Sequence, residues 1–89
     1  MGFNIKSFVL IFVDVTNLKR IGKTQKDIAE ILKKIPNVEN VDIITGEADL
    51  LVSIRAGDMQ DFQNILLDKI QSIEGIVKTK TMISLNEFY

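Results

Sequence analysis

The side chains in this sequence that could do acid–base or metal chemistry are almost all carboxylates. The chain has 12 Asp and Glu residues but no histidine and no cysteine. Histidine is the commonest general base near neutral pH and the commonest metal ligand, and structural zinc sites use Cys and His. An enzyme built from this chain would have only Asp14, Glu47 and Asp49 as candidate catalytic groups. We therefore expect no catalytic residue, no metal site and no cofactor.

The charge balance argues against direct nucleic-acid binding. The net charge is −1, whereas nucleic-acid-binding domains usually carry a basic excess that neutralises phosphates. Lys19, Arg20, Lys23 and Lys26 are the nearest approach to a basic cluster, and we interpret them as an exposed face. No apolar run approaches the roughly 18 residues of a membrane span, and no secretory signal is visible. We expect a cytoplasmic protein that contacts neither membrane nor nucleic acid directly.

Apolar patterning predicts a single α+β domain over residues 1–89. Its elements follow the order β-α-β-β-α-β, which is typical of a ferredoxin-like sandwich with an antiparallel sheet in the order 4-1-3-2. The first and third strands are the most apolar and are expected at the centre, because charged residues suit edge strands. Alternating or continuous apolar residues predict the four strands at 7–15, 38–45, 49–55 and 76–85.

Two amphipathic helices are predicted between these strands. Thr24 gives the first helix its start signal, and Pro36 stops it. Asp58 is the expected N-cap of the second helix, and Gly75 is its expected left-handed end. The polar segment 17–23, between the first strand and the first helix, is expected to be a loop.

Both faces of the central sheet are predicted to be apolar, although two helices can cover only one. In the first strand, Phe8, Leu10 and Phe12 alternate with apolar residues that point the other way. About 600 Å² of apolar surface would stay uncovered, and patches of that size mark interaction surfaces. Packing against an identical chain is the simplest closure. The alternative is partial cover by loops and by the tail residues Phe88 and Tyr89.

Two segments carry a resemblance to a known family. Residues 41–55 read VDIITGEADLLVSIR, and residues 73–85 read IEGIVKTKTMISL. With residues 35–38 (IPNV), they closely resemble the C-terminal effector domain of Lrp/AsnC transcription regulators, in the form of a stand-alone RAM domain (regulation of amino acid metabolism). The resemblance implies homodimers that close into a dimeric α+β barrel, tetramers or octamers of these, and a free amino acid effector bound between dimers. Because the 89 residues contain no helix-turn-helix, DNA binding is not carried over.

The resemblance also implies which residues line the effector pocket. They are a turn and part of the last strand: Gly46, Glu47, Ala48, Asp49, Thr79 and Thr81. Asp49 or Glu47 would accept a hydrogen bond from the ammonium group of the amino acid, and turn N–H groups and threonine hydroxyls would donate to its carboxylate. The alternatives are structural, because Gly and Asp are common in hairpin turns and Thr is a good strand former. Asp14 could face the same pocket or lie in solvent.

Two departures from the family pattern bear on function. Ala48 stands where family members often carry an aromatic residue, and the segment 17–23 is longer than usual. We predict an amino-acid-binding regulatory module, oligomeric, that modulates transcription by effector binding or by co-assembly with full-length Lrp/AsnC-type regulators. The alternative, which Ala48 favours, is a structural oligomerisation subunit with a degenerate effector pocket. A small enzyme of the dimeric α+β barrel class is the third hypothesis.

Overall fold

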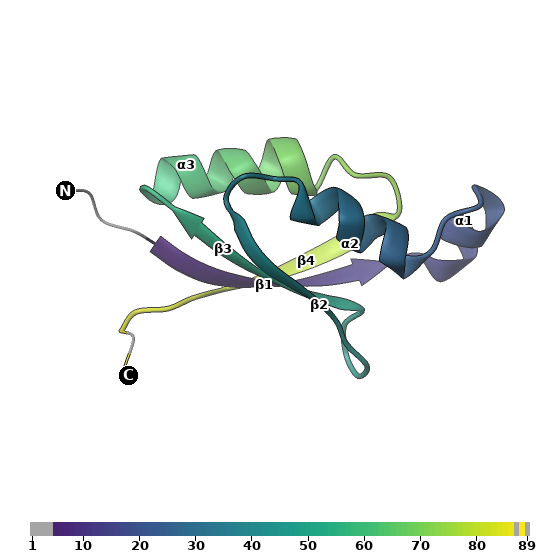
Figure 1. Cartoon of the computed structure of the whole chain (residues 1–89), viewed down its shortest axis with the longest axis horizontal. Helices are drawn as coiled ribbons and strands as arrows, with labels where there is room; N and C mark the ends of the chain where they lie inside the picture. The colour runs from purple at the N-terminus through teal and green to yellow at the C-terminus, as the bar shows by residue number, and fades with distance from the viewer. Residues whose placement is uncertain (1–4, 87, 89) are drawn as a thin grey trace.

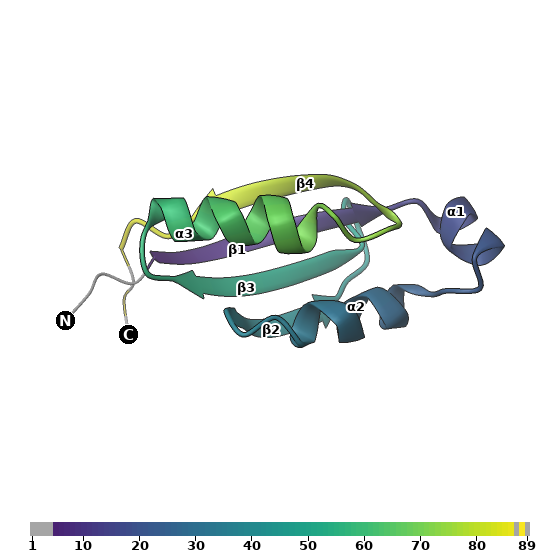
Figure 2. The ribbon, with the colours of Figure 1, turned by 90° about the horizontal axis from the view of Figure 1, so that it is seen from above.

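A four-stranded antiparallel sheet forms one layer of the molecule and two helices form the other (Figures 1 and 2). The computed structural model describes residues 5–86 and residue 88. The observed strand order, β2-β3-β1-β4, is the predicted order read from the other edge. The ferredoxin-like fold is thus confirmed. The strands are β1 (Ile5–Val13), β2 (Val38–Ile43), β3 (Leu50–Ala56) and β4 (Ile76–Ile83).

The first of the two helices that cover the sheet is α2 (Gln25–Lys33), and it begins after Thr24, as predicted. The Thr24 side chain accepts from the Asp27 N–H, and the Asp27 carboxylate accepts from the Thr24 N–H at 2.8 Å. This reciprocal capping box satisfies two amides that the helix leaves without internal partners. Ile28 and Leu32, one helical turn apart, are buried against the sheet.

The second helix has a change of winding that the sequence did not predict. It starts as α3 (Met59–Asn64), with the predicted N-cap Asp58 accepting from the Asp61 N–H at 2.7 Å. It then continues as a six-residue π-helical segment, η1 (Ile65–Ile70). The wider turn brings Ile65 and Ile70, five residues apart, into the core together. Gly75 then takes the predicted left-handed conformation, with φ of 102°.

The segment after β1 is a short helix, α1 (Val15–Arg20), so the prediction of a loop over 17–23 was wrong for most of that stretch. Asp14 caps this helix, because its side chain accepts a hydrogen bond from the Asn17 N–H at 3.1 Å. The strand β1 therefore ends at Val13, and not at residue 15 as predicted. Leu18 is only 2% exposed, because it packs over Gly75 at the end of the core. Because only one of the six residues of α1 is buried, the sequence shows no apolar periodicity that would indicate a helix.

The predicted second and fourth strands are each two residues too long, because β2 ends at Ile43 and β4 ends at Ile83.

The helices cover one face of the sheet, where the core lies. Val9 and Ile11 of β1 and Val52 and Ile54 of β3 are 0% exposed on that face. No helix among residues 5–86 lies on the other face (Figure 1). Within the described part of the chain, no helix is long and apolar enough to cross a membrane.

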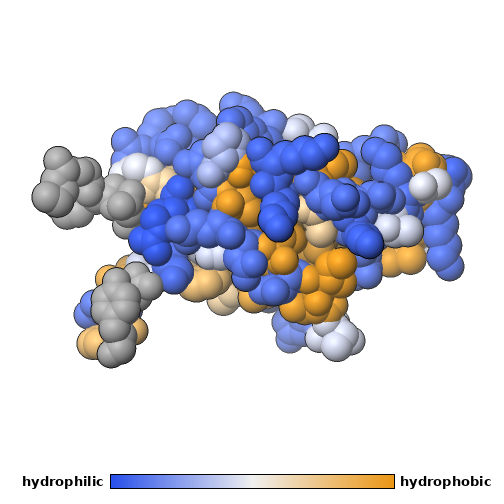
Figure 3. Space-filling model, in the orientation of Figure 1, coloured by the Kyte–Doolittle hydropathy of each residue, from blue (hydrophilic) through white to orange (hydrophobic). Residues whose placement is uncertain are grey.

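The second sheet face is apolar at its centre, as predicted. Phe8, Leu10 and Phe12 of β1 and Leu51 of β3 point away from the helices and are only partly shielded by their neighbours. Hydrophobic surface is visible below α2, at the level of the sheet (Figure 3). The described part of the tail does not cover it, because the Phe88 side chain is 86% exposed. Tyr89, which shared that predicted role, lies outside the described residues.

Candidate functional site

The loop between β2 and β3, residues 44–49, holds four of the six predicted site residues. The Ile44 N–H donates to the Asp49 carbonyl at 3.0 Å and closes the loop at its base. Gly46 has φ of 133°, a conformation that favours glycine, and no atom lies within 4 Å of the position a Cβ would take. Position 46 therefore favours glycine because of its backbone conformation, and not because neighbouring atoms would clash with a side chain.

Asp49 is the best-anchored residue of this loop. Its N–H donates to the Ile11 carbonyl at 2.9 Å, and its Oδ2 accepts from the Val13 N–H at 2.9 Å. Its Oδ1 accepts from Gln25 Nε2 at 2.8 Å. The residue thus joins the loop to the end of β1 and to the first turn of α2. Its carboxylate is half-buried, and both of the donors it meets are neutral.

An open pocket of about 470 Å³ lies beside this anchor. Its size falls within the range of small-molecule sites, which is about 300 to 1,000 Å³. Ala48 is buried at 4% exposure, whereas Glu47 is exposed. The pocket is lined by Gln25, Ile43, Ile44, Thr45, Gly46, Ala48 and Asp49. Sequence reasoning missed Gln25, which looked like an ordinary first residue of a helix.

The two predicted threonines lie on β4, on the side of the sheet that carries the helices. Thr79 pairs with Ile11 and Thr81 pairs with Val9, and the side chains of Ile11 and Val9 both face the core. The Thr79 hydroxyl accepts from Gln71 Nε2 at 3.0 Å. Thr79 and Gln71 line a separate pocket of about 260 Å³. Gln71, just past the end of η1, is a second polar residue that no sequence pattern singled out.

The two halves of the predicted site lie apart within one chain. Ile11 of β1 pairs with Leu50 on one side and with Thr79 on the other. Two strand spacings therefore separate the start of β3 from Thr79, which is roughly 10 Å. Asp14, the further candidate, caps α1 and is exposed. Among the described residues, no group of three or more acidic side chains could hold a metal ion.

A family model for the Lrp/AsnC ligand binding domain matches residues 9–89. Among curated proteins, the chain is 40% identical over 84 residues to the uncharacterized HTH-type transcriptional regulator PF0250 of Pyrococcus furiosus. That alignment covers 94% of this chain and 53% of the regulator. The chain thus spans about half the length of the curated relatives it matches.

Solved structures share the fold at lower identity. TTHA0845 from Thermus thermophilus is similar with a TM-score of 0.82 and 25% identity, over 96% of this chain and 98% of that one. AsnC of E. coli gives a TM-score of 0.82 at 21% identity, over 97% of this chain and 54% of that one. The regulator NMB0573 of Neisseria meningitidis, solved as a complex with L-Met, gives 0.80 at 23% identity, over 96% and 52%.

These matches agree with the observed order of strands and helices. The family model and the curated relatives identify a regulatory and not an enzymatic class of domain, in agreement with the prediction made from the lack of histidine and cysteine. The chain belongs to the Lrp/AsnC ligand-binding domain family.

Proposed function

We propose that this domain binds a free amino acid and, as an oligomer, transmits its presence to transcription regulators. Domains of this family typically form dimers and higher oligomers and bind amino-acid effectors. The observation that carries the proposal is the carboxylate of Asp49 in the wall of the loop pocket.

Asp49 suits the ammonium end of an amino acid. Its two hydrogen-bond donors, the Val13 N–H and the Gln25 amide, are neutral, so they orient the carboxylate without cancelling its charge. Charge-assisted hydrogen bonds are about twice as strong as neutral ones, and a carboxylate keeps free lone pairs after accepting two bonds. An ammonium group is therefore the complementary ligand.

The carboxylate end of the ligand needs donors from elsewhere. Thr79 and Thr81 are the predicted donors, but Thr79 lies roughly 10 Å from the loop across β1, and it lines another pocket. We infer that the threonines of one chain approach the loop of another chain when dimers associate. The site is then complete only in the assembly.

The uncovered sheet face supports the first step of that assembly. Phe8, Leu10, Phe12 and Leu51 form an apolar centre over which none of the helices in residues 5–86 lies. Burial of apolar surface contributes about 25 cal/mol per Å², which favours a second copy of the chain on this face. Dimers formed in this way leave both pockets free for contacts between dimers.

The regulatory partner follows from the relatives. PF0250 is named as an HTH-type regulator, and this chain matches about half of it. We propose that the domain acts in the cytoplasm, either alone as an effector sensor or by co-assembling with full-length regulators of the same family. Co-purification of a tagged domain with such a regulator tests the second mode.

A screen of the twenty amino acids by thermal shift tests the ligand class. A ligand at 100 times its Kd stabilises the native state by about 2.7 kcal/mol and raises the melting temperature by several degrees. For the best amino acid, the N-acetyl derivative and the carboxamide should both lose the shift, because each lacks one charged end. A shift that survives both modifications would contradict recognition of the free amino acid.

One observation favours a second function. Ala48 leaves the pocket without the aromatic wall that many family members have, and its methyl group is already buried. If none of the twenty amino acids changes the melting temperature, the domain is a structural oligomerisation subunit with a degenerate pocket. Co-assembly with full-length regulators would then be its whole role.

A further inference from the structure

A second pocket lies beside the loop pocket, between α1 and the start of α2. The helix α1 extends past the end of β1, next to the first turn of α2 (Figures 1 and 2). The volume of this α1 pocket is about 220 Å³. Small-molecule sites usually measure about 300 to 1,000 Å³, so the α1 pocket suits one part of a ligand. It is lined by Val15, Leu18, Lys19, Lys23, Thr24 and Gln25.

The Asp49 carboxylate is held where the two pockets meet. Its Oδ2 accepts from the Val13 N–H at 2.9 Å, and its Oδ1 accepts from Gln25 Nε2 at 2.8 Å. Gln25 lines both pockets, and Val15, two residues beyond Val13, lines the α1 pocket. A ligand whose ammonium group binds Asp49 can therefore extend a side chain past Gln25 into the α1 pocket.

The walls of the α1 pocket are apolar, and its rim is positively charged. Leu18 is 2% exposed and Val15 is 46% exposed, and both present aliphatic surface. Lys19 and Lys23 are exposed. Lysines of this kind pack their aliphatic stems on apolar surface and keep the ammonium group in water. The pocket thus complements a chain of methylene groups that ends in an anion.

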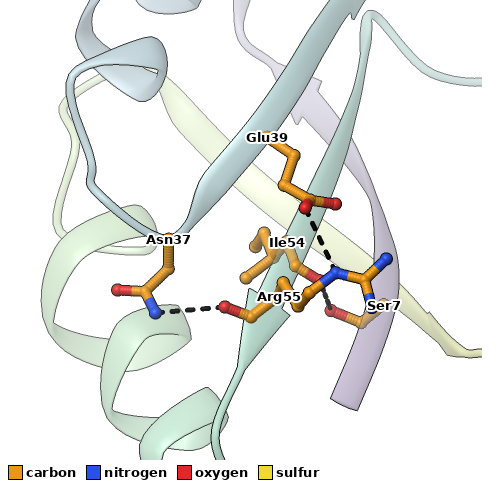
Figure 4. A network of polar contacts seen from close by, with 5 residues as sticks. All are labelled: Ser7, Asn37, Glu39, Ile54 and Arg55. Atoms are coloured by element: carbon orange, nitrogen blue, oxygen red, sulfur yellow. Dashed lines mark hydrogen bonds and ion pairs between the residues drawn. The ribbon is translucent and has the colours of Figure 1, made fainter. Parts of the chain in front are cut away.

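The two lysines on the rim are not matched by acids, unlike the arginine on β3. Arg55 Nε donates to Glu39 at 3.1 Å (Figure 4). In the described part of the chain, no acidic side chain forms such an ion pair with Lys19 or Lys23. The carboxylates closest to them in the sequence cap the helices α1 and α2. The rim therefore has two positive charges available for a ligand.

We propose that the effector of this domain is an amino acid with an acidic side chain, such as glutamate or its longer homologue 2-aminoadipate. This inference rests on the proposed function of the loop pocket, and it adds the chemical class of the effector. The ammonium group binds Asp49, and the methylene groups pack on Val15. The side-chain carboxylate then meets Lys19 and Lys23 at the rim.

The lysines are assigned to the side-chain carboxylate and not to the α-carboxylate. The α-carboxylate is attached to the same carbon as the ammonium group, so it cannot extend past Gln25 while the ammonium group stays at Asp49. It remains for the threonines of another chain. Only a carboxylate at the end of a side chain has the reach for the α1 pocket.

Isothermal titration of glutamate and 2-aminoadipate against their side-chain amides tests the assignment. The wild type should bind at least one of the acids at least about tenfold more tightly than its amide. The double variant Lys19→Gln/Lys23→Gln should bind that acid and its amide alike, because the rim has lost its charge. The control Lys26→Gln/Lys33→Gln removes the same charge from exposed positions that line neither pocket, and it should keep the preference.

A second pair of variants tests the apolar wall. Val15→Asp places an acid in the α1 pocket and should weaken binding of the preferred acid at least about tenfold. Thr16→Asp adds the same charge at the next residue, which is exposed and does not line the pocket, and should leave that affinity unchanged. Both changes add an acid to the first turn of α1, which the helix dipole favours, so neither should unfold the chain.

The outcomes separate this inference from the proposed function. Equal losses of acid and amide affinity in the Lys19→Gln/Lys23→Gln variant would overturn the inference, because the lysines would then bind the α-carboxylate. A preference for the acid that persists in this variant would overturn it too. A neutral amino acid that the wild type binds more tightly than both acids would overturn the acidic class and leave the proposed function standing. Binding of no amino acid at all would overturn both.

Discussion

The Asp49 carboxylate and the Gln25 amide meet at 2.8 Å, which joins the β2–β3 loop to the first turn of α2. The two residues are 24 positions apart in the chain, and both line the loop pocket. A ligand that contacts Asp49 therefore contacts a group held by two elements of the fold. In the proposed site, this anchoring would hold the Asp49 carboxylate in place before a ligand binds.

Gln25→Ala should destabilise the domain by about 1 kcal/mol, because one hydrogen bond to a charged, half-buried acceptor is lost. Urea unfolding followed by circular dichroism measures this change. The matched control is Gln60→Ala, which removes an exposed contact of 3.3 Å with Asn64 and should cost less than about 0.5 kcal/mol. Equal costs at the two positions would show that Gln25 does not anchor the loop.

Gly75→Ala should destabilise the domain by about 2 kcal/mol or more, and Gly46→Ala by about 1 kcal/mol. Both glycines have positive φ, but a Cβ at Gly75 would lie 2.5 Å from Leu18 Cδ2, whereas Gly46 faces open space. Leu18 is buried, at 2% exposure, so its side chain would have to shift within the core. Urea unfolding of both variants measures the difference.

A double variant isolates the steric part of that cost. Leu18→Ala should lower the free energy of unfolding less in the Gly75→Ala background than in the wild type, since the truncation also removes the clash. Strict additivity of the two changes would contradict the close packing of α1 on Gly75.

Leu10→Asp should convert the proposed dimer to a folded monomer, because Leu10 lies at the centre of the open sheet face. Sedimentation velocity with circular dichroism measures both properties. Val9→Asp, one residue away, should unfold the chain, since Val9 is 0% exposed under the helices. A Leu10→Asp variant that remains dimeric would show that the subunits associate through another surface.

Local patterns were enough to predict the layers of this fold. Strand alternation separated Val9 and Ile11 from Phe8 and Leu10, and helical spacing placed Ile28 and Leu32 in the core. These signals need only neighbouring residues. The strand order followed from the chain order of the elements and from the uniformly apolar character of two of the strands.

What the sequence did not predict depends on contacts between distant residues. The helix α1 is fixed by the burial of Leu18 against Gly75, which lies 57 positions further along the chain. The capping motif of Thr24 and Asp27 surrounds Gln25 but predicts no role for its side chain, and Gln71 has no motif around it. Their partners Asp49 and Thr79 are supplied by the fold. The loop was predicted as a site from family resemblance, but its anchoring required the register of β1 and β3.

The charge of Asp49 is the central element of the proposed site, and Asp49→Asn removes it with little structural change. Asparagine keeps an oxygen for the Val13 N–H, and its amide donates to Gln25 once the Gln25 amide rotates. Glu47→Gln removes an exposed charge two residues away and is the matched control. Isothermal titration with the best amino acid of the screen should show at least about tenfold weaker binding for Asp49→Asn and unchanged binding for Glu47→Gln. Wild-type affinity in Asp49→Asn would contradict the assignment of Asp49 as the ammonium acceptor.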